Sequence, residues 1–294
     1  MSIFTGSGVA IVTPFKEDKT VDFVAFEKLI NFQIENDTDA IIVCGTTGEP
    51  STLTEEERFE VIKFCVDKVE KRVPVIAGAG CNDTMQSVKM CKRCEEIGVD
   101  GLLIVTPYYN KTTQKGIINH YKIIAESVKL PIILYNVPSR TGLNMLPKTV
   151  LELSKVDNIV GIKEASGNIS QIVEIASICK EDFYIYSGND NQILPILSIG
   201  GKGVISVMAN IIPKDTHNII QKFLDNDFEE SKKIQLLSVE LASALFCEVS
   251  PIPVKTALEI MGYGKAHFRE PLIDMEPDNI IVLKNAMKNY GLIK

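Results

Sequence analysis

Eight short runs rich in Val, Ile and Leu recur along the 294-residue chain and constrain its fold more than any other feature. Most are continuously apolar rather than alternating, which is typical of parallel strands covered on both faces. They begin roughly every 20 to 34 residues, the spacing of βα units. The runs are Val9–Val12, Ala40–Cys44, Pro74–Ala77, Gly101–Val105, Pro131–Tyr135, Ile159–Lys163, Phe183–Ser187 and Gly203–Val207.

Segments with helical periodicity lie between these runs. Thr54–Lys71 starts with Thr54 as N-cap and Glu57 at the capping-box position, and Thr84–Ile97 ends at Gly98, a residue type that terminates helices. Further helices are expected at Pro147–Val156, Asn168–Cys179 and Asn191–Ile199. A strand followed by a helix, eight times over, is satisfied most economically by a closed (β/α)8 barrel, the TIM barrel of the α/β class. An open, doubly wound parallel sheet is the alternative.

The chain continues well beyond the eighth run. Lys214–Asp225 would complete the barrel, and three more helices are expected at Glu229–Phe246, Pro251–Met261 and Pro277–Tyr290. No Gly/Ser-rich linker or low-complexity tract separates them from the barrel. We therefore expect residues 1–225 to form the barrel and residues 226–294 to form a C-terminal helical extension packed on it.

Composition and charge exclude several classes of protein. The chain has 31 Lys and Arg against 38 Asp and Glu, whereas nucleic-acid binding requires a basic surface. The least charged stretch, 191–213, is broken by Pro195 and three glycines, so we expect no membrane span. Residues 1–15 lack the basic region of a secretory signal, and the seven cysteines are odd in number. We therefore expect reduced thiols and a cytoplasmic protein that binds neither nucleic acid nor membrane.

Polar and reactive side chains follow the expected strands at their carboxyl ends, where TIM-barrel active sites are built. Lys163 stands out because it ends an otherwise uncharged run. Forming a neutral lysine at pH 7 costs about 4–5 kcal/mol, and desolvation at a barrel mouth reduces that cost. The neutral amine can then condense with a carbonyl. The alternatives are a lysine that extends to the rim or a salt bridge with Glu164.

Two other strand ends carry candidate binding groups. Tyr135 ends the fifth run, and its hydroxyl can transfer protons, while Arg140 can bind a carboxylate through two hydrogen bonds. The glycine-flanked Thr46 and Thr47 offer hydroxyls and backbone N–H groups to a carboxylate or phosphate. This loop lacks the Lys-Ser/Thr of a nucleotide P-loop. Taken singly, each of these residues also fits a solvated position on the barrel rim.

No metal site, cofactor site or Ser-His-Asp triad is expected. Cys91 and Cys94 have the CxxC spacing of zinc ligands, but no second pair accompanies them. His120, His217 and His267 lie in expected helices or in the C-terminal tail, away from the strand ends.

Three motifs stand at the strand ends: GTTGE at 45–49, YNVPSRTG at 135–142 and GIKEASG at 161–167. Together they closely resemble the dihydrodipicolinate synthase family, Schiff-base lyases that use pyruvate and include N-acetylneuraminate lyase. The resemblance runs from Gly6 through at least Asn210, and the helical tail matches the family's layout. GTTGE and the lysine strand mark the whole family, whereas the arginine of YNVPSRTG discriminates the synthase from sugar-acid lyases.

The resemblance implies a lyase that condenses pyruvate with L-aspartate 4-semialdehyde to give 4-hydroxy-tetrahydrodipicolinate, the first committed step of diaminopimelate and lysine biosynthesis. Lys163 matches the lysine that forms the covalent imine with pyruvate, and no cofactor or metal is implied. Tyr135, Thr46 and Tyr109 match a proton-relay triad. In the family the tyrosine at the position of Tyr109 comes from a neighbouring subunit, so a dimer is the minimal active unit and a homotetramer, a dimer of dimers, is implied.

The resemblance also implies four substrate-binding residues. Thr47 matches a contact to the pyruvate carboxylate, and Arg140 matches the residue that holds the carboxylate of the semialdehyde. Gly188 and Ile205 match pocket-lining positions near the lysine.

The sequence departs from the family at a cleft where L-lysine inhibits many members. Asn82 and Tyr108 match lysine-contacting positions, but Gln86 stands where sensitive members carry a glutamate, and Glu55 and Arg58 stand where some carry histidines. Losing that carboxylate removes a charge-assisted contact of about 1.5–3 kcal/mol. We therefore expect a vestigial allosteric site and weak or absent inhibition by L-lysine.

Two other functions are compatible with parts of this pattern. An aldolase for a 2-keto-3-deoxy sugar acid or sialic acid would use the same lysine chemistry, but Arg140 suits a small carboxylated aldehyde better than a polyol. A non-catalytic barrel that binds an oxo acid as a sensor or scaffold does not account for the intact set of Lys163, Tyr135, Thr46 and Arg140.

Overall fold

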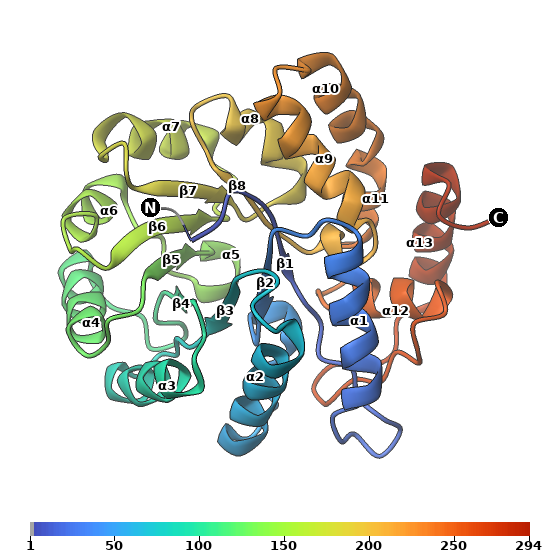
Figure 1. The fold of residues 1–294 in the computed structure, drawn as a ribbon, viewed down its shortest axis with the longest axis horizontal. Coiled ribbons are helices and arrows are strands. Elements are labelled where there is room, and N and C mark those ends of the chain that lie inside the picture. The colour runs from blue at the N-terminus through green and yellow to red at the C-terminus, as the bar shows by residue number, and fades with distance from the viewer. Residues whose placement is uncertain (1–2) are drawn as a thin grey trace.

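Eight parallel strands close into a barrel in the computed structural model, which describes residues 3–294 (Figure 1). Met1 and Ser2, which begin both the expected barrel segment and the stretch expected to lack a secretory signal, lie outside the described residues. The strands are β1 (Gly6–Ala10), β2 (Ala40–Val43), β3 (Val75–Gly78), β4 (Gly101–Val105), β5 (Ile132–Asn136), β6 (Ile159–Glu164), β7 (Tyr184–Ser187) and β8 (Gly203–Ser206). The expected barrel is confirmed, and the open sheet is excluded because β1 pairs with β8.

The first strand begins earlier than its hydrophobicity predicts. Gly6 pairs with Gly203 of β8, and the pairing continues to Val9 and Ser206. A Cβ on Gly203 would lie 1.9 Å from the Gly6 carbonyl oxygen, so only glycine permits the two strands to approach at this point. Small residues with no hydrophobic signal therefore close the barrel.

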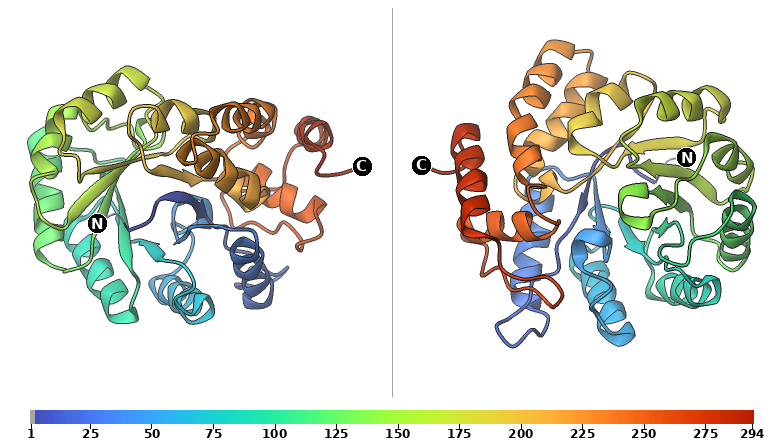
Figure 2. Two further views of the ribbon diagram at one scale, coloured as in Figure 1. Left: turned by 45° about the horizontal axis from the view of Figure 1, so that its top comes forward. Right: turned by 180° about the vertical axis from the view of Figure 1, so that it is seen from behind.

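Helices cover the outside of the barrel between successive strands (Figures 1 and 2). The capping box of Thr54 and Glu57 is present, and Gly98 ends its helix in the left-handed region with φ +92°. The covering helices are α1 (Phe23–Glu35), α2 (Glu55–Val69), α3 (Thr84–Ile97), α4 (Gln114–Glu126), α6 (Pro147–Leu153), α7 (Ile169–Ile178), α8 (Ile193–Leu197) and α9 (Pro213–Leu224). Three of the expected helices, at 147–156, 168–179 and 191–199, prove shorter, and η2 (Asp190–Gln192) replaces the first turn of the third.

The amino-terminal end of the barrel is filled by side chains. Phe4 stacks on Tyr186 with ring centroids 4.5 Å apart, and the Tyr186 hydroxyl donates to the Phe4 carbonyl oxygen at 2.7 Å. Both belong to an inner core cluster that also contains Ile42, Ile133 and Ile205. A larger core cluster lies between the strands and the surrounding helices. These side chains fill the interior of the barrel at this end, so we expect the functional site at the carboxyl ends of the strands.

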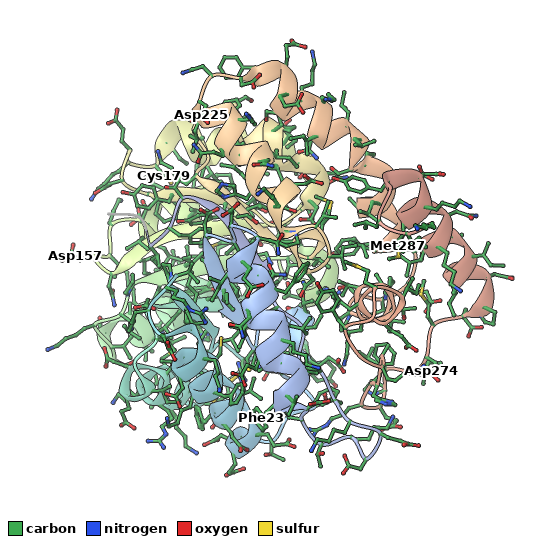
Figure 3. The ribbon with its side chains drawn as sticks, turned by 45° about the vertical axis from the view of Figure 1, so that its right-hand side comes forward. Phe23, Asp157, Cys179, Asp225, Asp274 and Met287 are labelled. Carbon is green, nitrogen blue, oxygen red and sulfur yellow. The ribbon has the colours of Figure 1, made fainter. Side chains whose placement is uncertain are left out.

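Four helices follow the barrel: α10 (Phe228–Leu237), α11 (Val239–Ala244), α12 (Ile252–Ile260) and α13 (Pro277–Tyr290). α10 packs on α9, and α13 packs on α11 and α12. Figure 3 labels Asp225, directly after α9, in the upper part of the view and Met287, on α13, at the right. No helix within residues 3–294 has the length and apolar character needed to cross a bilayer.

The expectation of a single helix at Glu229–Phe246 is wrong. Ser238 ends α10 and immediately precedes α11, and its hydroxyl donates to the Gln235 carbonyl oxygen at 2.8 Å. A serine hydroxyl that bonds to the preceding turn competes with the helical hydrogen-bond pattern and permits the chain to turn. The Gln235 side chain is held in turn by the backbone of Asp190 and Leu194, which fixes α10 against the barrel.

Candidate active site

Residues at the carboxyl ends of five strands, together with part of the C-terminal extension, line one cavity of about 380 Å³. Thr46 and Thr47 come from η1 (Thr46–Gly48) after β2, Tyr135 ends β5, Lys163 lies near the end of β6 and Gly188 follows β7. The remaining lining residues are Val137, Ser139, Arg140, Ala165, Asn189, Val207, Phe246, Glu248, Val249 and Ser250. Residues far apart in the sequence thus meet at the barrel mouth, where the sequence analysis expects them.

Lys163 is buried at the floor of this cavity. It pairs in register with Tyr135 on β5 and Tyr186 on β7, and it is 5% exposed. Its Nζ lies 4.5 Å from the centroid of the Tyr135 ring, so the ammonium contacts an aromatic face. The alternative of a lysine that extends to the solvated rim is therefore wrong.

Glu164 does not pair with Lys163, because adjacent residues of a strand point to opposite faces. Its carboxylate accepts hydrogen bonds from the side chains of Asn136 and Gln171 and from the backbone N–H of Ser166. Burial nevertheless raises the pKa of the Glu164 carboxyl above its ordinary value. The alternative of a salt bridge between Lys163 and Glu164 is therefore wrong, because uncharged donors surround the Glu164 carboxyl on the outer face of the strand.

The loop that carries Thr46 and Thr47 is held closely against the first strand. The Thr13 hydroxyl donates to the Gly48 carbonyl oxygen at 2.7 Å, and the Gly48 N–H donates to the Gly45 carbonyl at 2.8 Å. A Cβ on Gly48 would lie 3.3 Å from the Ile11 carbonyl oxygen, tighter than ordinary contacts. The loop therefore presents its threonine hydroxyls from a fixed turn.

Arg140 lies on α5 (Pro138–Thr141), a single helical turn that the sequence analysis did not anticipate. Its Nη2 donates to the Ser250 carbonyl oxygen at 3.0 Å, which directs the guanidinium across the mouth of the cavity toward the C-terminal extension. The remaining N–H groups are available to an anion entering the site.

The structure separates two of the expected site residues from this cavity. Ile205 is fully buried in the inner core cluster and does not line the cavity. Tyr109 is 91% exposed with φ 68°, and it lines a neighbouring cavity of about 560 Å³. Thr46 and Arg140 line both cavities, so they connect the Lys163 site to the surface that carries Tyr109.

Residues 3–290 match the family model described as the dihydrodipicolinate synthetase family. The chain belongs to this family. A curated relative from Acetivibrio thermocellus named 4-hydroxy-tetrahydrodipicolinate synthase is 58% identical over 291 residues, which cover 99% of each chain. The match to the whole chain confirms the resemblance drawn from the three motifs.

Solved structures of dihydrodipicolinate synthases share the fold. The enzyme from Cyanidioschyzon merolae with lysine bound superposes with a TM-score of 0.97 at 41% identity, covering 100% of both chains. A monomeric variant also superposes with a TM-score of 0.97, at 42% identity and with 99% and 98% of the two chains covered. The fold, including the helices that follow the barrel, is therefore that of the family.

The residues at the expected lysine cleft lie beside the Tyr109 cavity. The Asn82 carbonyl oxygen accepts a hydrogen bond from Asn110 at 3.0 Å, and Tyr108 lines the cavity together with Arg58. Gln86 donates to Glu55 at 2.8 Å. Glu55 also forms an ion pair with Lys89 at 2.5 Å, so the Glu55 carboxylate already has a cationic partner.

The sequence analysis missed the contribution of the C-terminal extension to the site. Four residues of the extension line the Lys163 cavity although they follow no strand and form no recognisable motif: Phe246, Glu248, Val249 and Ser250. It also missed Asp190, whose buried carboxylate accepts hydrogen bonds from the backbone of Val207 and Met208 and so ties the β7 and β8 loops together. Burial raises the pKa of the Asp190 carboxyl, and the charge of Lys163 opposes that rise.

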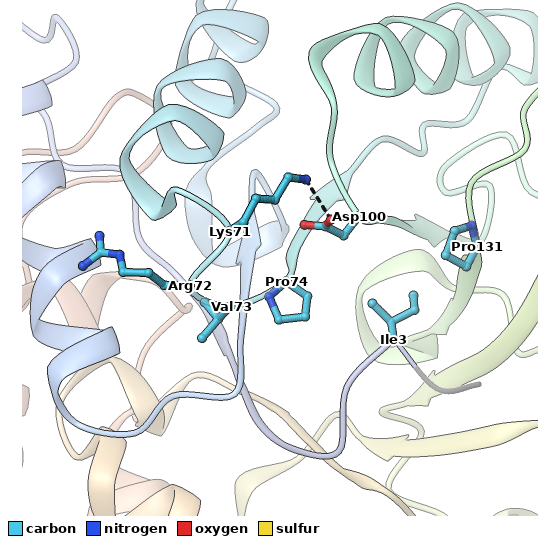
Figure 4. A pocket seen from close by; sticks show the side chains of 7 residues that line it. All are labelled: Ile3, Lys71, Arg72, Val73, Pro74, Asp100 and Pro131. Atoms are coloured by element: carbon cyan, nitrogen blue, oxygen red, sulfur yellow. Dashed lines mark hydrogen bonds and ion pairs between the residues drawn. The ribbon is translucent and has the colours of Figure 1, made fainter.

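A third cavity, of about 390 Å³, lies at the opposite end of the barrel (Figure 4). Ile3, Pro74 and Pro131 line it, and each of them precedes a strand. Lys71 and Asp100 at its edge pair with each other at 2.9 Å. Among the described residues that line this cavity, none is an unpaired reactive group comparable to Lys163.

Within residues 3–294, no group of three or more His, Cys, Asp or Glu side chains has the arrangement of a metal site.

Proposed function

We propose that the chain is a 4-hydroxy-tetrahydrodipicolinate synthase that condenses pyruvate with L-aspartate 4-semialdehyde on Lys163. The observation that carries the proposal is the buried amine of Lys163 in a cavity lined also by Thr47, Tyr135 and Arg140. The relatives' shared name and their identity to this chain support the same reaction.

The first step forms a covalent bond between enzyme and pyruvate. The neutral Lys163 amine attacks the C2 carbonyl of pyruvate, and the resulting carbinolamine loses one water to give the protonated imine. We assign the pyruvate carboxylate to the hydroxyl and backbone N–H groups of the loop at Thr47. We assign to Tyr135, whose ring contacts the lysine nitrogen, the transfer of the protons that water formation requires.

The second step makes the carbon–carbon bond. Loss of a proton from the pyruvate methyl group converts the iminium into an enamine, with the nitrogen accepting the electron pair. The enamine carbon attacks the aldehyde of the semialdehyde, and the developing alkoxide takes up a proton. The amino group of the second substrate then displaces Lys163, closing the ring and restoring the free amine. The reaction consumes both substrates and releases one water overall.

Arg140 is proposed to bind the carboxylate of the semialdehyde. Its guanidinium is exposed, it lines the cavity entrance, and the Ser250 carbonyl oxygen fixes its direction. A planar guanidinium matches a carboxylate through two parallel hydrogen bonds, and a polyol substrate would gain less from it. Arg140 therefore favours the synthase over a sugar-acid aldolase.

We propose that Tyr109 acts in the site of a neighbouring subunit. The tyrosine is 91% exposed and lies outside the Lys163 cavity of its own chain, although Thr46 adjoins both cavities. A partner bound over this surface would bring a second Tyr109 close to Thr46 and Tyr135. The active unit is then a dimer, and two dimers make the homotetramer that the family resemblance implies.

Three further features belong to the same proposal. The imine with pyruvate supplies the electron sink that a cofactor would otherwise provide, so the chemistry calls for no metal. Residues 226–294 act as an extension of the barrel, since α10 packs on α9 and residues 246–250 line the active-site cavity. The seven cysteines are free thiols, four of them buried, which supports a reducing, cytoplasmic location.

Borohydride reduction in the presence of pyruvate tests the proposal. The reduced imine should add a stable mass to the peptide that contains Lys163, and Lys163→Ala should abolish the label. Turnover should then appear with L-aspartate 4-semialdehyde and not with sialic acid. A protein in which Lys163 stays unmodified under these conditions is not a Schiff-base lyase.

A further inference from the structure

A buried ion pair joins the C-terminal extension to the loop that carries Thr46 and Thr47. Lys255 on α12 donates from Nζ to Glu49 Oε1 at 2.6 Å, although 206 residues separate them. Their side chains are only 3% and 2% exposed. Glu49 directly follows η1, so its side chain is the connection between α12 and the segment that contains Thr46 and Thr47.

The ammonium of Lys255 is fixed from several sides. It donates a second hydrogen bond, to the His267 carbonyl oxygen at 2.6 Å, and it lies 4.4 Å from the Phe15 ring centroid and 5.0 Å from that of Phe268. These contacts hold the Lys255 ammonium in one position, so it cannot move together with the Glu49 carboxylate. Glu49 is therefore held wherever Lys255 places it.

Arg269 adds a second connection between the extension and the same segment. Its guanidinium pairs with Glu57 at 2.5 Å and donates to the Thr52 carbonyl oxygen at 2.8 Å. It also lies 4.7 Å from the Phe15 ring centroid, so the two cations approach the same aromatic ring. The C-terminal extension thus contacts the segment after β2 at two places: Lys255 binds Glu49, and Arg269 binds Thr52 and Glu57.

The loop itself requires such support. Cys44 and Glu49, which flank Gly45–Gly48, have φ values of 52° and 54°, in the left-handed region that residues other than glycine rarely adopt. A backbone of this kind persists only where its surroundings hold it. Glu49 Oε2 is buried without a hydrogen-bond partner within the described residues, so Lys255 alone orients the carboxylate.

We propose that Lys255 is a positioning residue for pyruvate capture: through Glu49 it holds the hydroxyls of Thr46 and Thr47 where the Lys163 imine forms. The C-terminal extension then completes the active site, both through residues 246–250 and through this ion pair. The inference rests on the proposed function.

The first experiment compares Lys255→Met with a matched control. Lys265→Met removes another lysine of the C-terminal extension. Lys265 pairs with Glu259 at 2.7 Å, but its side chain is 76% exposed. We expect Lys255→Met to slow borohydride trapping of pyruvate on Lys163 at least tenfold and to raise the KM for pyruvate. The control should leave both quantities unchanged. Equal trapping rates in wild type and Lys255→Met would overturn the inference.

A second variant separates positioning from stability. Replacing a buried ion pair by apolar residues often preserves or increases stability, whereas removing one partner leaves an uncompensated charge. The double variant Glu49→Leu with Lys255→Met should therefore recover the melting temperature while pyruvate trapping stays at least tenfold slow. Recovery of trapping together with the melting temperature would show a merely structural role. The double variant carries the test if Lys255→Met alone does not fold.

The wild-type protein distinguishes the two hypotheses. If pyruvate and borohydride do not label Lys163 in the wild type, the proposed function is wrong. If the wild type is labelled and the Lys255 variants are labelled as fast, only the positioning role is wrong.

Discussion

The nitrogen of Lys163 lies 4.5 Å from the ring centroid of Tyr135, on the neighbouring strand and in direct register with it. Strand pairing therefore places an amine and a phenol side by side at the floor of the cavity. The two side chains are 5% and 7% exposed, so bulk water competes little for their protons. This arrangement motivates the proposal that Tyr135 exchanges protons with an imine on Lys163.

Tyr135→Phe tests that role. General acid–base catalysis by a positioned side chain typically contributes 10²–10⁴-fold, so we expect kcat to fall by about that factor while the fold is retained. Tyr121→Phe is the control, because the Tyr121 hydroxyl is also buried but bonds to the Ile104 carbonyl oxygen, away from the cavity. Steady-state kinetics of both variants decide the matter, and an unchanged kcat for Tyr135→Phe removes Tyr135 from the mechanism.

Arg140→Met should separate the two substrates. Loss of a charge-assisted contact of about 1.5–3 kcal/mol lowers kcat/KM for the semialdehyde about 10- to 150-fold. Trapping of pyruvate by borohydride should continue at the wild-type rate, because the imine forms at Lys163. Arg93→Met is the control, since Arg93 pairs with Glu96 on the outer surface of α3. A parallel loss of pyruvate trapping would contradict a role confined to the second substrate.

Local sequence patterns predict most of the barrel and several residues that line its candidate site. Continuous apolar runs identify parallel strands, and residues at strand ends converge because all the strands of a closed barrel point the same way. That reasoning places Lys163, Tyr135, Thr47 and Arg140 in one cavity without any contact information. The wrong helix at Glu229–Phe246 failed for a local reason, because a serine hydroxyl interrupts the helix at Ser238.

What the sequence could not predict depends on contacts between distant segments. The pair of Glu49 and Lys255 joins residues 206 positions apart, and neither residue is unusual in its own segment. The entry of Phe246 and Ser250 into the cavity likewise follows from the packing of the extension rather than from periodicity. Tyr109 is a different case. The family resemblance assigns it to the active site, but within its own chain the side chain is exposed and lies outside the Lys163 cavity.

Subunit mixing tests whether Tyr109 acts across an interface. Tyr109→Phe and Lys163→Ala should each lose most activity, the first by about 10²-fold and the second almost completely. Mixed dimers should regain activity, because the intact Lys163 of one chain meets the intact Tyr109 of the other. Activity is measured after the two variants are unfolded and refolded together. A mixture no more active than its separate components would place Tyr109 outside the partner's site.

Inhibition by L-lysine should be weak or absent. By the family resemblance, Gln86 stands where lysine-sensitive members carry a glutamate, and Glu55, to which Gln86 donates, is already paired with Lys89. Gln86→Glu combined with Glu55→His should restore a free carboxylate and strengthen inhibition about 10- to 150-fold, from about 1.5–3 kcal/mol. Activity is titrated with L-lysine, and D-lysine serves as the control. A micromolar inhibition constant for the wild type would show this prediction to be wrong.

His217 should stabilise the fold at low pH. Its Nδ1 lies 2.8 Å from Asp39 Oδ2 at the amino-terminal end of the barrel, and this hydrogen bond raises the pKa of His217 above its ordinary value. Because the folded protein holds the proton more tightly than the unfolded chain, the stabilisation is fully present below about pH 6.5 and is lost as the pH rises through the folded pKa.

The pair is partly solvent-exposed, so we expect it to contribute about 1 kcal/mol to the free energy of unfolding. Urea unfolding of wild type and His217→Gln at several pH values measures the difference directly. The difference should be largest at acid pH and shrink at alkaline pH. For His120 the pH dependence has the opposite sign. Burial lowers the pKa of His120 to about 4, so the neutral side chain costs the folded protein stability as the pH falls below about 6.5, and His120→Gln removes that loss. A difference for His217→Gln that does not change with pH would mean that Asp39 is bonded to a neutral imidazole throughout.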